Sequence, residues 1–190
     1  MFSTYLSLGF DHILDLNGYD HILFVVALCA IYKVSEWKKV LILVTAFTIG
    51  HSITLAMSAL DMVSFKAEII EFLIPLTILI TALSNVLLSA NTDKNVNRNY
   101  FMALFFGFIH GLGFSNYFKA LLGREESVVQ PLLAFNIGVE LGQILIVMIS
   151  MAAGYLFMNL LKARQREWIL FVSGAAAGIS YILLMNAKFW

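Results

Sequence analysis

The sequence predicts an all-α protein, a polytopic membrane helical bundle with about six transmembrane helices and a short N-terminal interfacial segment. The 190 residues are 61% hydrophobic and have a mean hydropathy of +0.87, which is typical of a chain that crosses a bilayer several times. Six apolar runs also have the length of ~20 residues that a bilayer core requires. They cover residues 18–34, 38–60, 68–90, 99–122, 130–160 and 167–187.

The stretches between these runs are too short for a separate soluble domain, so we expect 1–190 to form a single transmembrane domain. Similar motifs at 18–23 (GYDHIL) and 107–112 (GFIHGL) raise the hypothesis of two three-helix halves, 1–90 and 99–190. The first 17 residues contain Asp11 and Asp15 and no basic residue. We interpret them as a short interfacial or re-entrant segment and not as a signal peptide.

Basic residues indicate the orientation of the chain. Eight of the twelve follow the first, third and fifth runs or begin the next one: Lys33, Lys38, Lys39, Lys94, Arg98, Lys162, Arg164 and Arg166. The positive-inside rule therefore predicts a multi-pass protein of the bacterial inner membrane with both termini outside. Acidic residues gather on the predicted outer side, where an anionic rim attracts cations. The formal net charge of zero gives no reason to expect nucleic acid as a partner.

Ionisable side chains inside the apolar runs are the main functional signal. Each costs ~2.5–3.5 kcal/mol at the membrane centre, so these groups must face one another or water. All four histidines of the chain lie in or just before the runs, in the predicted outer half of the bilayer: His12, His21, His51 and His110. Imidazoles together with the carboxylates of Asp20, Glu71 and Glu140 form a mixed set that suits borderline divalent ions such as nickel, zinc or cobalt.

Local patterns around these residues favour close helix packing. In FFGFIHGLGFS, glycines on both sides of His110 allow a neighbouring helix or a ligand to approach the imidazole. In FNIGVELGQ, a polar stripe of Asn136, Glu140 and Gln143 lies beside a GxxxG face at 138–142. The last run has no buried ionisable group, and we interpret it as scaffold in which Gly174 and Gly178 indicate close packing.

Structural interpretations of the same residues remain open. An intramembrane histidine can serve only as a hydrogen-bonded strut between helices. Glu140 with Asn136 and Gln143 can form a neutral network in which burial keeps the carboxyl protonated. Struts on five helices have no reason to lie at one depth, and this coincidence favours a metal site.

The motifs GFDHILDLNGYDHILF, FTIGHSITL, FFGFIHGLGFSNYF and FNIGVELGQ make the chain resemble the HupE/UreJ family over residues 9–147. This family comprises small membrane proteins associated with hydrogenase and urease maturation and regarded as nickel permeases. The resemblance places its motif residues on His12, Asp20, His21, His51, His110 to Phe114, Asn136 and Glu140. TAFTIGHSITL combined with IEFLIPLTILITAL is similar to the flavobacterial-type branch.

The first hypothesis is an inner-membrane transporter for a divalent transition metal, with nickel favoured. Asp20 and His21 are expected to bind the ion first. An inner site then consists of His51, His110 and Glu140, and Glu71 is a gate or proton acceptor. His12 and Asn136 are further members. Ligand imidazoles must be neutral, so uptake is expected to fall as the pH drops.

The second hypothesis is an intramembrane zinc-dependent hydrolase, in which histidines hold the metal and Glu140 or Asp20 is the general base. A third is a metal sensor or assembly partner without transport. The sequence favours a transporter over an enzyme. We expect the bound species to be a divalent ion, nickel or zinc. The expected partners are this ion and membrane lipid, and a homo-oligomer is possible on the sequence alone.

Overall fold

The structure, a computed structural model, describes residues 2–88, 96–123 and 127–187. Over this part of the chain it consists of helices and connecting segments without strands, which confirms the all-α prediction. In chain order the helices are α1 (Phe2–Ile13), α2 (Asp20–Cys29), the 3-10 helix η1 (Val34–Glu36), α3 (Trp37–Ala59), α4 (Ala67–Leu88), α5 (Val96–Leu122), α6 (Val129–Leu160) and α7 (Gln165–Asn186). The last two residues of the third predicted run and Lys94 lie outside the described residues.

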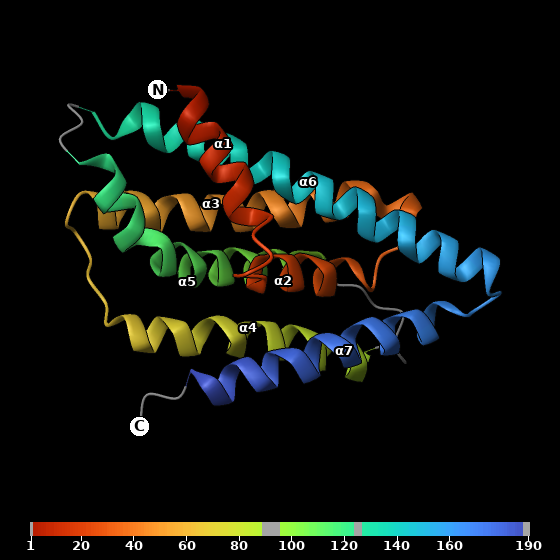
Figure 1. Cartoon of the computed structure of the whole chain (residues 1–190). Coiled ribbons are helices and arrows are strands. Elements are labelled where there is room, and N and C mark those ends of the chain that lie inside the picture. Colours follow the sequence, from red (N-terminus) through yellow and green to blue (C-terminus); the bar gives the residue numbers. More distant parts are fainter. Residues whose placement is uncertain (1, 89–95, 124–126, 188–190) are drawn as a thin grey trace.

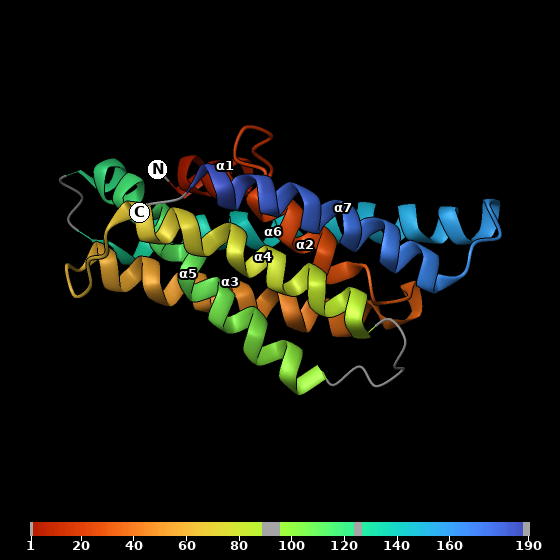
Figure 2. The ribbon, with the colours of Figure 1, turned by 90° about the horizontal axis from the view of Figure 1, so that it is seen from below.

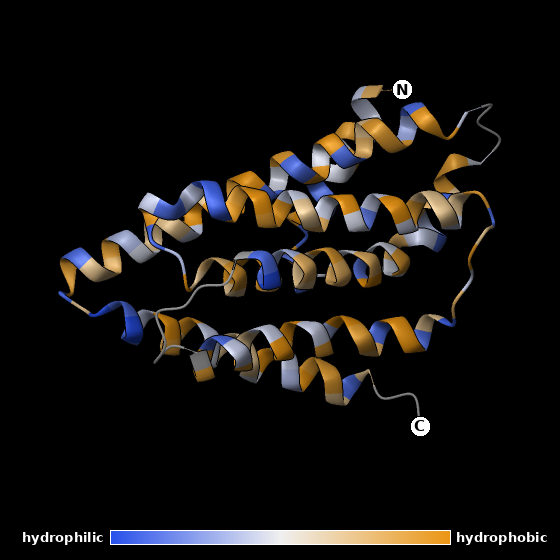
Figure 3. Ribbon diagram, turned by 180° about the vertical axis from the view of Figure 1, so that it is seen from behind, coloured by the Kyte–Doolittle hydropathy of each residue, from blue (hydrophilic) through white to orange (hydrophobic). Residues whose placement is uncertain are grey.

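The long helices α3 to α7 lie side by side in an elongated bundle (Figure 1; Figure 2). All five are long and apolar enough to cross a membrane, and hydrophobic residues cover most of their length (Figure 3). The closest partners are α3 with α5, α1 with α6, and α4 with α7. Helix α1 begins and α7 ends at the same end of the bundle, here called the terminal end (Figure 1). The protein is therefore a multi-pass membrane protein.

The first predicted span, 18–34, is shorter than expected. Its helix α2 covers only the ten residues Asp20–Cys29, about 15 Å, which is half of a bilayer core. Side chains from distant helices satisfy carbonyl groups near its end, because Asn85 Nδ2 donates to the Ala27 oxygen (2.7 Å) and Gln165 Nε2 donates to the Ile31 oxygen (2.9 Å). The apolar run gave no sign of these tertiary contacts. Among the described residues, five helices are long and apolar enough to span a membrane, and α2 is not one of them.

The N-terminal segment is a helix that packs along α6. Helix α1 starts at the terminal end and runs about halfway along the bundle, and α2 continues toward the opposite end (Figure 1; Figure 2). The non-helical residues 14–19 separate them. Together, the two short helices form one broken segment whose inner ends meet near the middle of the bundle. The hypothesis of two three-helix halves stays a prediction.

Glycines allow the close helix pairs that build the core. A Cβ on Gly138 would overlap the Leu6 carbonyl oxygen of α1, and a Cβ on Gly9 would overlap the Phe135 carbonyl oxygen of α6. In α5, a Cβ on Gly107 would overlap the Phe47 carbonyl oxygen of α3 in the same way. The predicted packing roles of the GxxxG face and of the glycines around His110 are confirmed.

The expected packing role of Gly174 and Gly178 is wrong. A Cβ added at either position meets no atom within 4 Å. The inward face of α7 is instead formed by Ser173, Ala176 and Ser180, which are 0%, 1% and 0% exposed. Glycine spacing alone does not say which face of a helix turns inward, and the register against α4 decided it here.

Candidate metal centre

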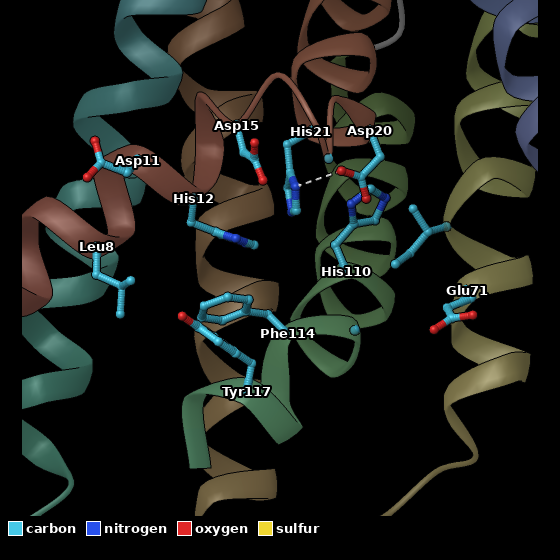
Figure 4. A pocket seen from close by; sticks show the side chains of 13 residues that line it. Leu8, Asp11, His12, Asp15, Asp20, His21, Glu71, His110, Phe114 and Tyr117 are labelled. Atoms are coloured by element: carbon cyan, nitrogen blue, oxygen red, sulfur yellow. Dashed lines mark hydrogen bonds and ion pairs between the residues drawn. The ribbon is translucent and has the colours of Figure 1, made fainter. Parts of the chain in front are cut away.

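The four histidine rings converge at the break between α1 and α2. The ring centroids of His12 and His21 are 4.6 Å apart, and those of His21 and His110 are 5.0 Å apart. His51 lies 5.9 Å from His12 and 6.1 Å from His21. Figure 4 shows three of these rings facing a common space, with Asp20 beside His21. Helices α1, α2, α3 and α5 contribute one imidazole each, as the sequence predicted from their common depth.

Two groups of three side chains have the spacing that a metal ion requires. One is His12, His21 and His51, and the other is Asp20, His21 and His110. Within each group, one ligand atom of every residue lies within 4.8 Å of the others. His21 belongs to both groups, so they form one continuous centre. Imidazole nitrogen and carboxylate oxygen are ligands that borderline divalent ions accept.

Packing of the broken segment fixes the two N-terminal imidazoles. His12 is in the last turn of α1, and its ring lies against Phe114 of α5, with ring centroids 3.9 Å apart. Asp20 and His21 form the first turn of α2, where the partial positive charge of the helix N-terminus favours a carboxylate. His51 and His110 are held where α3 and α5 approach closely, and both are 0% exposed.

Hydrogen bonds fix the tautomers of two histidines. His21 Nδ1 lies 3.2 Å from Asp20 Oδ1, so the imidazole carries its hydrogen on Nδ1 and donates it to the carboxylate. His110 Nε2 lies 3.2 Å from Thr77 Oγ1, and the Thr77 hydroxyl donates its own hydrogen to the Ile74 carbonyl oxygen (2.7 Å). A hydroxyl has only one hydrogen, so His110 Nε2–H is the donor. The lone pairs of His21 Nε2 and His110 Nδ1 are therefore free.

Unpartnered nitrogens are the strongest indication of a ligand. His12 Nε2, His21 Nε2, His110 Nδ1 and both ring nitrogens of His51 are buried without a hydrogen-bond partner. Each buried polar atom left unpaired costs about 1–3 kcal/mol, and such groups are rare in folded proteins. Burial, and after it the neighbouring His21, hold the pKa of His12 well below its usual range, so this ring is neutral. A metal ion held by either group of three would satisfy the unpartnered nitrogens of that group.

A pocket of about 550 Å³ leads to this centre. Its wall includes His12, Asp20, His21 and His110, and also the carboxylates of Asp11, Asp15 and Glu71. These last three side chains are exposed, and Glu71 faces the pocket from α4 (Figure 4). The approach to the histidines is therefore anionic and favours cations.

A known protein family matches nearly the whole chain. The family described as HupE / UreJ protein matches residues 1–189. The chain belongs to the HupE/UreJ family. Membership implies a nickel or cobalt permease or an accessory function in handling these metals. No curated protein and no solved structure matches the chain.

In this HupE/UreJ protein, Glu140 lies apart from the histidine groups. Its carboxylate accepts hydrogen bonds from Thr45 Oγ1 (2.6 Å) and Thr48 Oγ1 (2.5 Å) of α3. Thr48 Oγ1 is also 2.8 Å from Gln143 Oε1. Asn136 belongs to neither group, and its Oδ1 is buried without a partner. Glu140 and Gln143 of α6 therefore form a polar network with Thr45 and Thr48 of α3, apart from the histidine groups with which the sequence had placed Glu140.

Sequence reasoning missed Thr77, whose hydroxyl orients His110. A threonine in an apolar helix carries no signal of such a role, because it also bonds readily to its own backbone. In the sequence, the only pattern that set Thr77 apart was its spacing of four residues from Thr81, which places both hydroxyls on one face of the helix. Asp11 and Asp15 were recognised as acidic residues of the outer side but not as part of the pocket wall.

Proposed function

We propose that this protein is a permease of the bacterial inner membrane that carries a divalent transition metal ion, with nickel as the favoured substrate. The observation that carries the proposal is the set of four imidazoles from four helices, each with a buried and unpartnered nitrogen. The ion is bound by His12, His21, His51 and His110 together with Asp20. The terminal end of the bundle faces the outside of the cell.

The ion reaches the centre through the pocket. Asp11, Asp15 and Glu71 attract it, and it then meets His21, which both ligand groups share. Asp20 holds the Nδ1 hydrogen of His21 and directs Nε2 toward the ion. Broken helices that meet at a binding site are a recurring feature of transporters. The break between α1 and α2 gives this chain such a feature.

The ligand set favours nickel over softer ions. Only nitrogen and oxygen donors belong to the two groups, and such donors suit nickel, cobalt and zinc. Cys29 is buried in α2 and belongs to neither group, so no thiolate favours copper(I). Family membership then favours nickel or cobalt within this class.

The zinc hydrolase remains the second hypothesis, and no observation at the site favours it over transport. Glu140, one of its two expected bases, is bonded to Thr45 and Thr48 apart from the histidines. Asp20, the other, accepts a hydrogen bond from His21.

Flux measurements test the proposal. The purified protein is reconstituted into liposomes that contain a nickel-sensitive dye, and influx is compared between the unmodified chain, His21→Ala and the control Thr54→Val. Thr54 is buried on α3 and bonds to carbonyl groups of its own helix. We expect nickel influx in the unmodified chain and the control, and none in His21→Ala. Equal influx in all three, or none in any, contradicts the proposal.

A further inference from the structure

A row of polar side chains on α4 leads away from the metal centre toward the opposite end of the bundle. Thr77, Thr81 and Asn85 are four residues apart and share one face of the helix. They are 3%, 6% and 6% exposed. At a rise of 1.5 Å per residue, the row extends about 12 Å. It begins at Thr77, the partner of His110 Nε2, so it starts where the metal centre ends.

The two threonines present oxygen lone pairs to the helix interface. Thr77 Oγ1 donates to the Ile74 carbonyl oxygen (2.7 Å), and Thr81 Oγ1 donates to the Thr77 carbonyl oxygen (2.9 Å). Each hydroxyl has used its single hydrogen within α4. Thr81 Oγ1 keeps both of its lone pairs, and Thr77 Oγ1, which accepts the hydrogen of His110 Nε2, keeps one. A cation or its hydrating water can use these lone pairs.

Small side chains lie near Asn85, at the far end of this row. Ala27 of α2, Ala82 of α4 and Ala176 of α7 form a buried cluster separate from the main core, with Leu23 and Ala177 packed against it. Ser173 and Ser180 of α7 are buried beside it. No large side chain belongs to the buried part of this cluster, so a small separation of α7 from α4 opens space beside Asn85.

Asn85 closes the far end of the row. Its Nδ2 donates to the Ala27 carbonyl oxygen (2.7 Å) and to Ser173 Oγ (3.3 Å), which joins α2, α4 and α7 through one side chain. Ala27 lies in the last turn of α2, whose carbonyl end carries the negative part of the helix dipole and favours a cation.

Polar contacts continue beyond Asn85. Gln165 Nε2 donates to the Ile31 carbonyl oxygen (2.9 Å), and Asn99 Nδ2 donates to the Tyr32 hydroxyl (2.8 Å). The other polar network, of Thr48, Glu140 and Gln143, has no such continuation. The next inward-facing residues of α6 and α3 are large and apolar and at most 9% exposed: Ile146, Val147, Met151, Val40 and Leu43.

We propose that the metal ion leaves the histidine centre along the face of Thr77, Thr81 and Asn85, and that Asn85 is the residue that closes this passage. The inference rests on the proposed permease function. Helix α7 packs mainly on α4 and much less on α2 and α6. Movement of α7 as a rigid body, with release of Asn85 from Ser173, therefore opens the passage without disturbing the histidines.

Isosteric removal of one hydroxyl tests the route. Thr81→Val deletes an oxygen whose hydrogen bond, among the described residues, stays within α4, and Thr54→Val deletes one that bonds to carbonyl oxygens of α3. In nickel-loaded liposome assays we expect at least about tenfold slower flux for Thr81→Val, because a cation loses an oxygen contact. Bound nickel per purified chain should be unchanged in both variants. Equal flux in Thr81→Val and Thr54→Val overturns the route.

A reversible cross-link tests the opening. Ala82→Cys with Ala176→Cys, in a Cys29→Ala background, joins α4 to α7 across the cluster. Oxidation should stop flux, and reduction should restore it, with bound nickel unaffected; unchanged flux after complete oxidation overturns the passage.

Asn85→Ala should raise flux several-fold, and an unchanged or lower flux overturns its closing role. If the unmodified chain shows no flux, the proposed permease function itself is wrong. This outcome is distinct from the results above, which overturn only the exit route or the role of Asn85.

Discussion

The His12 ring meets the His21 ring edge-on, with centroids 4.6 Å apart and an interplanar angle of 66°, across the break between α1 and α2. The two short helices thus touch through their imidazoles at the point where the chain loses helical hydrogen bonds. A metal ion between these rings would bridge the break. Metal binding is therefore expected to attach α1 to the bundle and raise the thermal stability of the protein.

His21 is expected to matter more than His12. His21 belongs to both ligand groups, whereas loss of His12 leaves Asp20, His21 and His110 in place. His21→Ala should abolish nickel binding to the purified protein, and His12→Ala should retain a weaker site. Isothermal titration with nickel checks both variants. An equal loss of nickel binding in His21→Ala and His12→Ala would contradict the prediction that both ligand groups share His21.

Glu140→Gln is expected to retain the bound metal. The Glu140 carboxylate bonds to Thr45 and Thr48 and lies in neither ligand group, and the amide keeps one acceptor for these hydroxyls. Elemental analysis of the purified variant should give the same nickel content per chain as the unmodified protein. A loss of bound nickel would return Glu140 to the ligand set that the sequence suggested.

Thr77→Val should weaken nickel binding by about tenfold, the lower range for loss of a group that orients a metal ligand. The change removes the acceptor of His110 Nε2–H and leaves the ring without its tautomer constraint. Titration with nickel measures the affinity, and nitrogen NMR of labelled histidine reports the tautomer. Thr54→Val is the control. An unchanged affinity with an altered tautomer would show that orientation of His110 is unimportant.

Gly138→Ala should release α1 from α6, because the added methyl group overlaps the Leu6 carbonyl oxygen. Overpacking of this kind costs typically about 1–3 kcal/mol. We expect a lower melting temperature and weaker nickel binding, because His12 moves with α1. Gly174→Ala is the matched control, since its methyl group meets no atom within 4 Å. Similar melting temperatures for both variants would refute the close α1–α6 contact.

Nickel binding should fall on acidification, but only below the ordinary imidazole pKa of about 6.5. Burial lowers the pKa of His12, so this ring stays neutral and able to bind until the pH is well below that value. Protons then compete with the ion for the ring nitrogens. Equilibrium dialysis with nickel between about pH 8 and about pH 4, which covers the titration range of imidazole, measures the pH at which half of the bound nickel is lost. A midpoint above the ordinary value would contradict a buried neutral His12.

The candidate site could be recognised in outline because each residue carried its own signal. Histidines and carboxylates inside apolar helices must converge, since lipid offers them no partner. The rings of His12, His21, His51 and His110 do lie together, and their role as metal ligands stays a prediction. The sequence placed Glu140 with them because the same cost applies to any carboxylate. Thr45 and Thr48 supply an equally satisfactory partner, and their hydroxyls are common in membrane helices.

The sequence by itself determined the membrane class, the all-α architecture and the long helices between 37 and 186, because hydropathy and residue chemistry are local properties. Tertiary structure alone decided the break between α1 and α2, the inward face of α7, the separate place of Glu140 and the role of Thr77. Each of these depends on which atoms of a distant helix satisfy a backbone or side-chain hydrogen bond. That information is not contained in any single segment.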